Sequence, residues 1–391
     1  MEIPILISGG GIGGMAAGLA PGQSGFPVHV AEQAAEFSEI GAGLQLAPNA
    51  LRILEELGVR PAVDALAVQP RNLVFMHADT GKHLTTVEFG ATFRARYGQP
   101  YAVMHRGDLL DVLLAACRAH EAVTLENNKR VTDIQDHATF AEVSFADGTS
   151  YRCGAVVGAD GLWSRTRALL ADDRPRADTY VAYRGAIPVS EIASPIEADD
   201  EIIWIGAHKH LVQYPIRRGE LYNQVAVFRS AKYSPEIELT DTWGGPTELD
   251  EAFAGAYEQV RSSIGLINRE RRWIMYDRPP LTNWTMGRIT LLGDAAHPMV
   301  QYLAQGACQA IEDAGCLARS VTKSGGDVDE AFAAYQAERI PRTTLVQQVA
   351  RGWGEVWHDD AGVISALRDR LFARRATDDY TDFDWLYGSR G

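Results

Sequence analysis

The beginning of the chain contains the pattern that most constrains its fold. An apolar run over Ile3 to Ser8 leads into a turn of glycines, small residues follow over Met15 to Ala20, and a second apolar run ends at Glu32. This order predicts a strand, a tight turn, a helix that packs closely on a sheet, and a second strand. Pro21 is expected to end the helix early, because proline cannot continue a helix. Such a beginning is typical of a parallel α/β fold.

The spacing of the glycines predicts a dinucleotide site. Gly9, Gly11 and Gly14 satisfy G-x-G-x-x-G. Glycines permit a tight turn and let the backbone approach a pyrophosphate, to which the N-terminus of the following helix presents free N–H groups. Glu32 follows 18 residues after Gly14, where an acid can bind ribose hydroxyls. A glycine-rich turn without a ligand is the alternative, and the strand, helix and acid in register disfavour it.

Composition excludes several function classes. The 391 residues include 37 Lys and Arg and 51 Asp and Glu, a net charge of −14, which disfavours nucleic acid as a partner because phosphate binding needs clustered basic residues. No apolar run is long enough for a membrane span, and no basic segment typical of a signal peptide opens the sequence. The four cysteines form no CxxC pair, which indicates buried thiols rather than disulfides or a metal site. We therefore expect a cytoplasmic globular protein.

The middle of the chain changes character. Segments over Glu201–Ile205, His210–Ile216 and Tyr222–Phe228 are rich in β-branched and aromatic residues, and turn residues separate them. This pattern predicts an antiparallel sheet. A further apolar strand over Ile289–Leu292 and helical sequence then return the chain to α/β character. The predicted organisation is a discontinuous α/β domain over 1–175 and 276–340, an inserted β-sheet domain over 176–275, and a helical C-terminal region over 341–391.

Three further short motifs follow predicted strands or open a helix. The run from Val156 ends in the turn Asp160-Gly161, the run from Leu291 ends in an acidic turn with Gly293 and Asp294, and Arg106 opens a helix. Each motif alone is also compatible with an ordinary surface turn.

Together these motifs resemble those of the class A flavin-dependent aromatic hydroxylases, and the likeness covers almost the whole chain. It rests on GAGLQLAPNA (41–50), PYAVMHRGDL (100–109), HLVQYP (210–215), NQVAVF (223–228) and GDAAHPMVQYLAQGACQAIEDA (293–314). The resemblance implies a Rossmann-type FAD-binding domain, a substrate domain formed by the inserted sheet, and a helical C-terminal region. It also implies bound FAD, NADH or NADPH as a transient co-substrate, and O2.

The resemblance implies which residues bind FAD. The glycine turn would face the pyrophosphate, Glu32 the ribose, and Asp294 a ribityl hydroxyl. The N-terminus of the predicted helix from Ala307 would face the flavin and stabilise negative charge on it, although a plain core helix is the alternative. The implied cofactor-binding residues are Gly9, Gly11, Gly14, Glu32, Arg106, Asp160, Gly293, Asp294, Gly306 and Ala307.

Ring hydroxylation needs an electron-rich ring, so the site should contain a base near a phenol and a polar partner for a carboxylate. His210, Val212 and Tyr214 alternate along a predicted strand, so their side chains share one face. His210 is the candidate base and Tyr214 a candidate hydroxyl donor, whereas each of them alone would more often be a structural residue. The resemblance implies that Gln301 and Tyr101 join them in a site for a small aromatic acid.

The narrower stretches imply hydroxylation of a hydroxybenzoate, with 3-hydroxybenzoate converted to 2,5-dihydroxybenzoate (gentisate). Salicylate or another phenolic acid is the first alternative. A flavoprotein that does not hydroxylate and a nucleotide-binding regulatory protein are the others. Trp353, Trp357 and Trp385 are expected in tail packing or in the surface of a homodimer rather than around a substrate.

Overall fold

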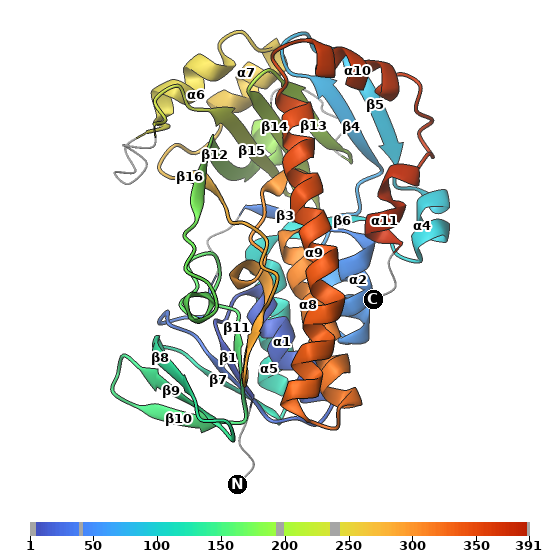
Figure 1. Ribbon diagram of the computed structural model, residues 1–391. Helices are drawn as coiled ribbons and strands as arrows, with labels where there is room; N and C mark the ends of the chain where they lie inside the picture. The colour runs from blue at the N-terminus through green and yellow to red at the C-terminus, as the bar shows by residue number, and fades with distance from the viewer. Residues whose placement is uncertain (1–4, 39–41, 193–198, 235–242, 389–391) are drawn as a thin grey trace.

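The computed structural model describes residues 5–38, 42–192, 199–234 and 243–388. Ile3 and Pro4 of the first predicted strand and Gly41 of the GAGLQLAPNA stretch lie outside these residues. Figure 1 shows one sheet above another, with the long helix α9 (Val328–His358) running beside both. In the part of the chain that is described, no helix combines the length and apolar character needed to cross a membrane.

The lower sheet is parallel, as the opening of the sequence predicts. Its strand order is β17-β18-β11-β1-β2-β7, and only the short β17 runs antiparallel to its neighbour. The central β1 is flanked by β2 and β11, so distant parts of the chain return to its two sides. The strands are β1 (Ile5–Ser8), β2 (Val28–Ala31), β7 (Val123–Glu126), β11 (Ala155–Gly158), β17 (Thr285–Met286) and β18 (Ile289–Leu291).

Helix α1 (Ile12–Gln23) follows β1 and packs against α5 (Arg106–Ala119) and α8 (Gly306–Lys323). Its small residues also let it pack closely on the sheet, since a Cβ added at Gly18 would lie 2.8 Å from Cγ2 of Val30 in β2.

The early end predicted for α1 is wrong, because the helix continues through Pro21 to Gln23. A proline this close to the C-terminus removes a single helical N–H donor. The Pro21 carbonyl in turn accepts hydrogen bonds from the N–H groups of Ser24 and Phe26, at 3.0 and 3.1 Å. The helix therefore ends in an ordinary hydrogen-bonded turn.

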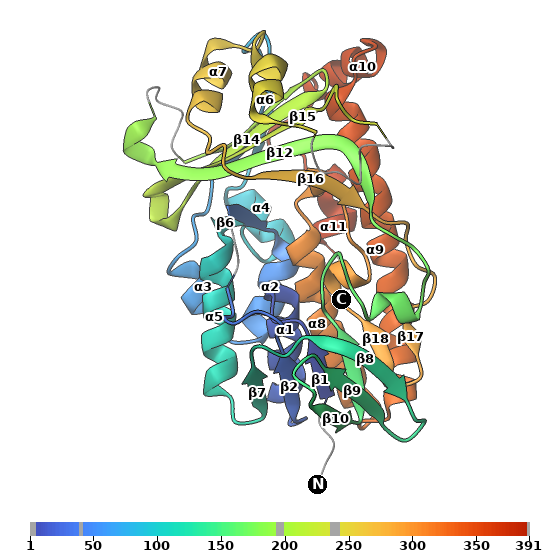
Figure 2. The same ribbon diagram turned by 90° about the vertical axis from the view of Figure 1, so that its left-hand side faces the viewer.

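A small antiparallel sheet covers the other face of the parallel sheet. Side chains such as Val143 and Phe145 pack there against Leu6 and Val156, and Figure 2 shows this sheet in front of the parallel strands. Its strands are β8 (Val131–Asp136), β9 (Ala141–Phe145) and β10 (Ser150–Cys153).

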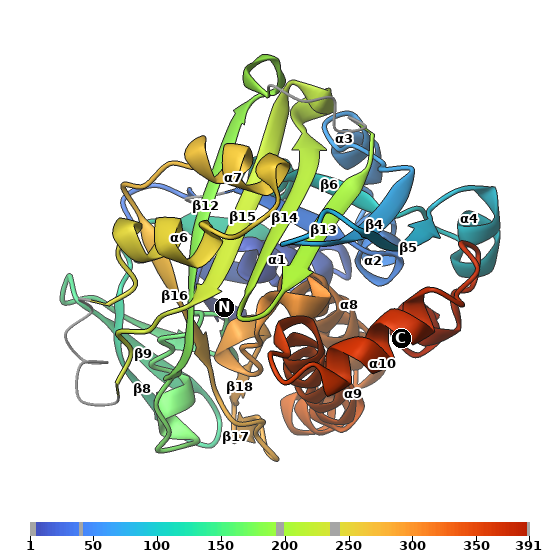
Figure 3. The same cartoon turned by 90° about the horizontal axis from the view of Figure 1, so that it is seen from above.

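The upper sheet confirms the predicted antiparallel strands and extends beyond them. Its order is β16-β12-β15-β14-β13-β4-β5, and all its pairs are antiparallel except β13 with β4. Helices α6 (Pro246–Phe253) and α7 (Glu258–Gly265) cover its outer face, as Figure 3 shows. The strands are β4 (Asn72–His77), β5 (His83–Glu88), β12 (Arg176–Pro188), β13 (Glu201–Gly206), β14 (Lys209–Ile216), β15 (Leu221–Arg229) and β16 (Arg272–Asp277).

The proposed domain boundaries stay a prediction, and the structure adds two facts to them. Strands β4 and β5 reach the upper sheet from outside 176–275, and α9 passes position 341 without a break. A two-stranded ribbon and shorter helices complete the fold: β3 (Gly43–Leu46), β6 (Ala102–His105), α2 (Pro48–Glu56), α3 (Arg60–Asp64), α4 (Ala91–Tyr97), α10 (Val363–Phe372) and α11 (Asp384–Tyr387).

A buried group of charges ties α8 to α9. Arg339 donates to Asp313 and to Glu312, at 2.6 Å each, and Asp313 also accepts a hydrogen bond of 2.9 Å from the N–H of Gly293. Burial alone would raise the pKa of Asp313, but His297 and Arg339 hold it at about 2. The carboxylate therefore stays charged and fixes the turn after β18 to both helices.

We predict that Arg339→Met lowers the free energy of unfolding by about 3–5 kcal/mol, because it leaves Asp313 buried without its guanidinium partner, although Glu312 keeps its ion pair with Arg342. Arg319→Met is the matched control. Its side chain is 31% exposed and pairs with Glu338 at 3.2 Å, so its loss should cost less than about 1 kcal/mol. Urea denaturation of the purified variants measures both, and equally small losses would contradict a stabilising role of the buried group.

Candidate active site

A cavity of about 1030 Å³ lies between the two large sheets. The loops that follow β1, β11 and β18 form one wall, which is the carboxyl edge of the parallel sheet. Ligands of open α/β sheets bind at this edge. The inner face of the upper sheet and the second half of α9 form the opposite wall.

The wall at the parallel sheet suits a dinucleotide. Gly11 is the N-cap residue of α1 and provides no side-chain cap, so the first N–H groups of the helix are left for a ligand. Arg106 at the start of α5 and Asp294 after β18 line the same wall. Gly293, Gly306 and Ala307 also line it, which brings six of the ten predicted cofactor residues together.

The other four predicted cofactor residues shape the turns behind this wall. A Cβ added to Gly14 would lie 1.9 Å from the carbonyl oxygen of Gly9, so only glycine permits this turn. Glu32 accepts a hydrogen bond of 2.7 Å from the N–H of Gly10, and Asp160 accepts two from backbone N–H groups of its own turn. Contact between these four residues and a cofactor stays a prediction.

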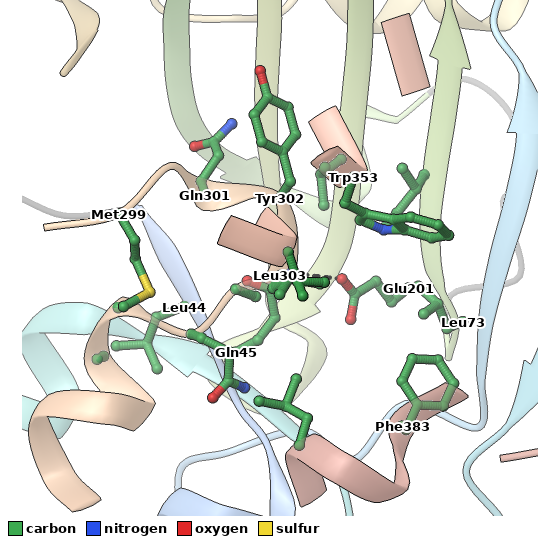
Figure 4. A pocket seen from close by; sticks show the side chains of 18 of the residues that line it. Leu44, Gln45, Leu73, Glu201, Met299, Gln301, Tyr302, Leu303, Trp353 and Phe383 are labelled. Atoms are coloured by element: carbon green, nitrogen blue, oxygen red, sulfur yellow. Dashed lines mark hydrogen bonds between the residues drawn. The ribbon is translucent and has the colours of Figure 1, made fainter. Parts of the chain in front are cut away.

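All four predicted substrate residues line the cavity: Tyr101, His210, Tyr214 and Gln301. Tyr101 precedes β6, and His210 and Tyr214 project from β14 on the face that strand alternation predicts. Gln301 lies in the loop before α8, beside Tyr302 (Figure 4). The structure thus brings together residues that are 200 positions apart in the chain.

A chain of hydrogen bonds crosses this part of the cavity. Arg184 donates to Gln301 Oε1 at 2.8 Å, which turns the amide nitrogen of Gln301 toward His210 Nε2 at 3.3 Å. His210 Nδ1 lies 2.8 Å from Nε2 of His358. An amide nitrogen can only donate, so His210 Nε2 accepts and Nδ1 carries the proton. Burial, followed by the neighbouring His358 and Arg184, lowers the pKa of His210 well below its usual value, so the ring is neutral.

Arg184 is a functional residue that the sequence reasoning missed. It enters the cavity from β12, its Nε has no hydrogen-bond partner, and in the described part of the chain no carboxylate forms an ion pair with it. Burial and the nearby Arg106 lower its pKa to about 10, so it remains charged at neutral pH. An arginine within the apolar stretch 181–187 of β12 is the signal that could have identified it.

Glu201 and Gln45 were also missed, and Figure 4 shows both in the cavity wall. Gln45 Nε2 donates to Glu201 Oε1 at 2.6 Å, while Glu201 Oε2 is buried without a partner. Burial raises the pKa of Glu201 to about 7, against the smaller opposing effect of Gln45. Nothing in the local sequence distinguishes Glu201 from an ordinary residue at the start of a strand.

The three tryptophans Trp353, Trp357 and Trp385 pack against the core near the C-terminus, as expected, and they also line the cavity. Helix α9 carries Trp353 and Trp357 along the inner face of the upper sheet, where the Trp353 ring lies 6.2 Å from that of Phe372 in α10. The Trp357 ring meets that of His210 edge-on, with 5.2 Å between the ring centroids. The expectation that these rings do not surround a substrate stays a prediction.

Comparison with known proteins agrees with this site. A family described as "FAD binding domain" matches residues 2–350. The 3-hydroxybenzoate 6-hydroxylase of Klebsiella oxytoca is 38% identical over 384 residues, which cover 98% of this chain and 96% of that protein. The 3-amino-4-hydroxybenzoate 2-monooxygenase PtnB3 of Streptomyces platensis is 36% identical over 391 residues, covering 98% of this chain and 95% of that protein.

Solved structures show the same fold. Klebsiella pneumoniae HpxO, complexed with FAD and uric acid, superposes with a TM-score of 0.86 at 24% identity and covers 100% of this chain and 98% of its own. A substrate complex of salicylate hydroxylase gives a TM-score of 0.81 at 23% identity, covering 99% of this chain and 96% of its own.

We predict that Gly11→Val weakens FAD binding at least about tenfold, equivalent to about 1.4 kcal/mol, because its side chain would enter the dinucleotide wall. The φ and ψ of Gly11, −74° and −175°, suit any residue, so the fold should persist. Gly90→Val is the matched control, since Gly90 is also an N-cap with extended backbone and a Cβ there would meet nothing within 4 Å. Titration of both apoproteins with FAD measures the difference, and equal affinities would remove Gly11 from the FAD site.

Proposed function

The chain belongs to the FAD-binding class A aromatic hydroxylases, and from this premise we propose that it hydroxylates a hydroxybenzoate with NAD(P)H and O2. The simplest substrate of this class is 3-hydroxybenzoate, with 2,5-dihydroxybenzoate as the product. The observation that carries the proposal is the row of Arg184, Gln301 and His210, which combines a cation without an acid partner and a neutral base in one apolar cavity.

The glycine turn, Arg106 and Asp294 would hold FAD at the parallel-sheet wall. When bound, FAD would supply the redox chemistry, in which electrons from NAD(P)H activate O2 so that one of its atoms enters the ring and the other leaves as water. The remaining steps belong to the side chains of the upper sheet and α9, which orient the ring, exclude water and move its phenolic proton.

His210 is suited to accept the phenolic proton. Its Nε2 accepts only the long contact of 3.3 Å from Gln301, which a phenol can replace with a shorter hydrogen bond. A ring that gives up this proton is more electron-rich and reacts faster with an electrophile. General-base assistance of this kind contributes about 10²–10⁴-fold to a rate.

The proton then needs a way out, because a charged imidazole is disfavoured at this buried position. His210 Nδ1 donates to His358 Nε2 at 2.8 Å. Burial lowers the pKa of His358 to about 3, so the proton does not rest there and passes on through the 5% of the His358 surface that is exposed. Transfer along the pair lets Nε2 of His210 take a proton while Nδ1 passes one on. When the hydroxylated ring regains its aromaticity, its original oxygen takes a proton back along the same path.

Arg184 is the proposed partner of the substrate carboxylate. A buried guanidinium without an acid partner is costly, and an aromatic carboxylate supplies the missing charge with two oxygens in a geometry that suits arginine. Its hydrogen bond with Gln301 places this cation next to the proposed base. A benzoate with a phenol group near its carboxylate therefore satisfies both residues at once.

We predict that purified holoenzyme oxidises NADH or NADPH in the presence of 3-hydroxybenzoate and forms 2,5-dihydroxybenzoate in a near-stoichiometric amount. Salicylate and 4-hydroxybenzoate should give less product for each nicotinamide consumed. Chromatography of the products, with hydrogen peroxide measured in parallel, tests this. Loss of carbon dioxide from salicylate would favour the salicylate alternative. Nicotinamide oxidation without any hydroxylated product would favour a flavoprotein that does not hydroxylate, and no stimulation by any aromatic acid would favour a regulatory protein.

A second prediction concerns His210. His210→Ala should still bind FAD and still allow NADH to reduce it, whereas hydroxylation should slow by about 10²–10⁴-fold. Reducing equivalents should then appear as hydrogen peroxide, so the ratio of product to NADH falls.

His358→Phe gives a smaller fall in the same ratio, because it removes the proton acceptor but keeps an aromatic ring in place. His208→Gln is the control, since its side chain lies near the surface and binds Asp360 at 2.8 Å. A substrate whose phenol is already ionised should be hydroxylated equally well by wild type and His358→Phe. An unchanged ratio in His210→Ala would exclude His210 as the base.

A further inference from the structure

The cavity wall formed by the upper sheet arranges three polar groups around an apolar patch. Arg184 of β12 pairs in register with Val225, Val225 pairs with Val212, and Val212 pairs with Ile203. The three aliphatic residues line the cavity and form a flat surface on which an aromatic ring can lie.

His210 and Glu201 lie at opposite ends of this patch. His210 precedes Val212 by two residues and pairs with Ile205 at the far end of β13, whose first residue is Glu201. The four residue steps from Glu201 to Ile205 correspond to about 13 Å along the strand. Strands β15 and β14 separate β12 from β13, which puts Arg184 and Glu201 on backbones about 14 Å apart. Arg184 and Glu201 therefore approach a bound ring from different sides.

Glu201 is difficult to explain as a structural residue. It is 1% exposed and only one of its oxygens has a hydrogen-bond partner. The wall around it combines the apolar Leu73 and Ile203 with the nearby hydroxyl groups of Tyr101 and Tyr214, neither of which bonds Oε2. A buried oxygen without a hydrogen bond lowers stability, because it gives up its bonds to water without replacement. In Figure 4 the carboxyl group of Glu201 projects from the sheet into the cavity.

We propose that the substrate ring bears, besides its carboxylate and its phenol, a third substituent with an N–H or O–H group that donates to Glu201 Oε2. This inference rests on the proposed function and narrows it to aminohydroxybenzoates and dihydroxybenzoates. Arg184 binds the carboxylate, His210 the phenol and Glu201 the additional donor. 3-Hydroxybenzoate is then a minimal substrate that leaves Glu201 without its partner.

Gln45 determines the direction of this hydrogen bond. Its amide N–H occupies Oε1 of Glu201, so Oε2 is the oxygen left for the substrate. In Glu201→Gln the new amide oxygen keeps the hydrogen bond with Gln45, and the new NH2 group replaces Oε2. An amino or hydroxy substituent of the substrate then faces another hydrogen-bond donor, which disfavours its binding. A methoxy substituent, which only accepts hydrogen bonds, can instead bind the new NH2 group.

The test compares the affinities of the FAD-loaded enzyme for substituted rings that differ only in one group. The probes are 3-hydroxybenzoates that carry an amino, hydroxy or methoxy group at position 4 or 5, and their affinities are read from the change in the FAD absorbance spectrum. Wild type should bind the amino or the hydroxy ring about 10- to 100-fold more tightly than the methoxy ring. The amino and hydroxy probes distinguish the two kinds of donor. Glu201→Gln should abolish or invert this preference, while its affinity for 3-hydroxybenzoate itself should change by less than about threefold.

Three outcomes would overturn the inference. The first is that wild type binds the rings with a donor group and the methoxy rings with equal affinity. The second is that Glu201→Gln lowers the affinity for all rings by the same factor, as a general distortion of the cavity wall would. Loss of FAD from Glu201→Gln would instead identify the cofactor as the partner of this carboxyl group. Because binding is measured separately from turnover, a wild type that binds these rings but hydroxylates none would contradict the proposed function and leave the assignment of Glu201 standing.

Discussion

The buried carboxylate of Asp313 is the interaction on which the site depends. Its two oxygens accept from Arg339 of α9 and from the N–H of Gly293, and it also binds His297. One charged group in α8 thus fixes the turn that carries Asp294, the start of the helix at the cavity, and the helix that carries Trp353 and His358. Neighbouring positive groups outweigh the effect of burial on its pKa, so the constraint persists throughout the neutral range.

The cavity combines two walls with different physical characters. The parallel-sheet wall offers backbone N–H groups and glycines, which suit a phosphate-containing ligand whatever its reaction. The upper-sheet wall is apolar and carries a few isolated polar side chains: Arg184, His210 and Glu201. Burying polar atoms without hydrogen-bond partners lowers stability. This wall therefore favours a ligand that supplies the missing partners. We therefore propose that the cofactor and the substrate are recognised by different parts of the fold.

The sequence predicted the parallel sheet and most of the antiparallel sheet because these features are local. Alternation along β14 places His210 and Tyr214 on one face, whatever the rest of the fold. The spacing of the glycines around Gly11 likewise predicts a tight turn before a helix. The prediction failed at Pro21, where proximity to the end of the helix made the proline tolerable. It was incomplete at Trp353, because α9 brings this ring to the cavity wall as well as to the packing near the C-terminus.

The sequence by itself determined the kind of fold, the dinucleotide wall and the face of the strand that carries the candidate base, since each depends on neighbours within a few positions. Only the tertiary structure decided which distant residues complete the site. Arg184, Glu201 and His358 lie on separate elements, and no local pattern links them to Gln301 or His210. Their roles follow from missing partners and from contacts between elements, and these arise only when the two sheets and α9 enclose a common cavity.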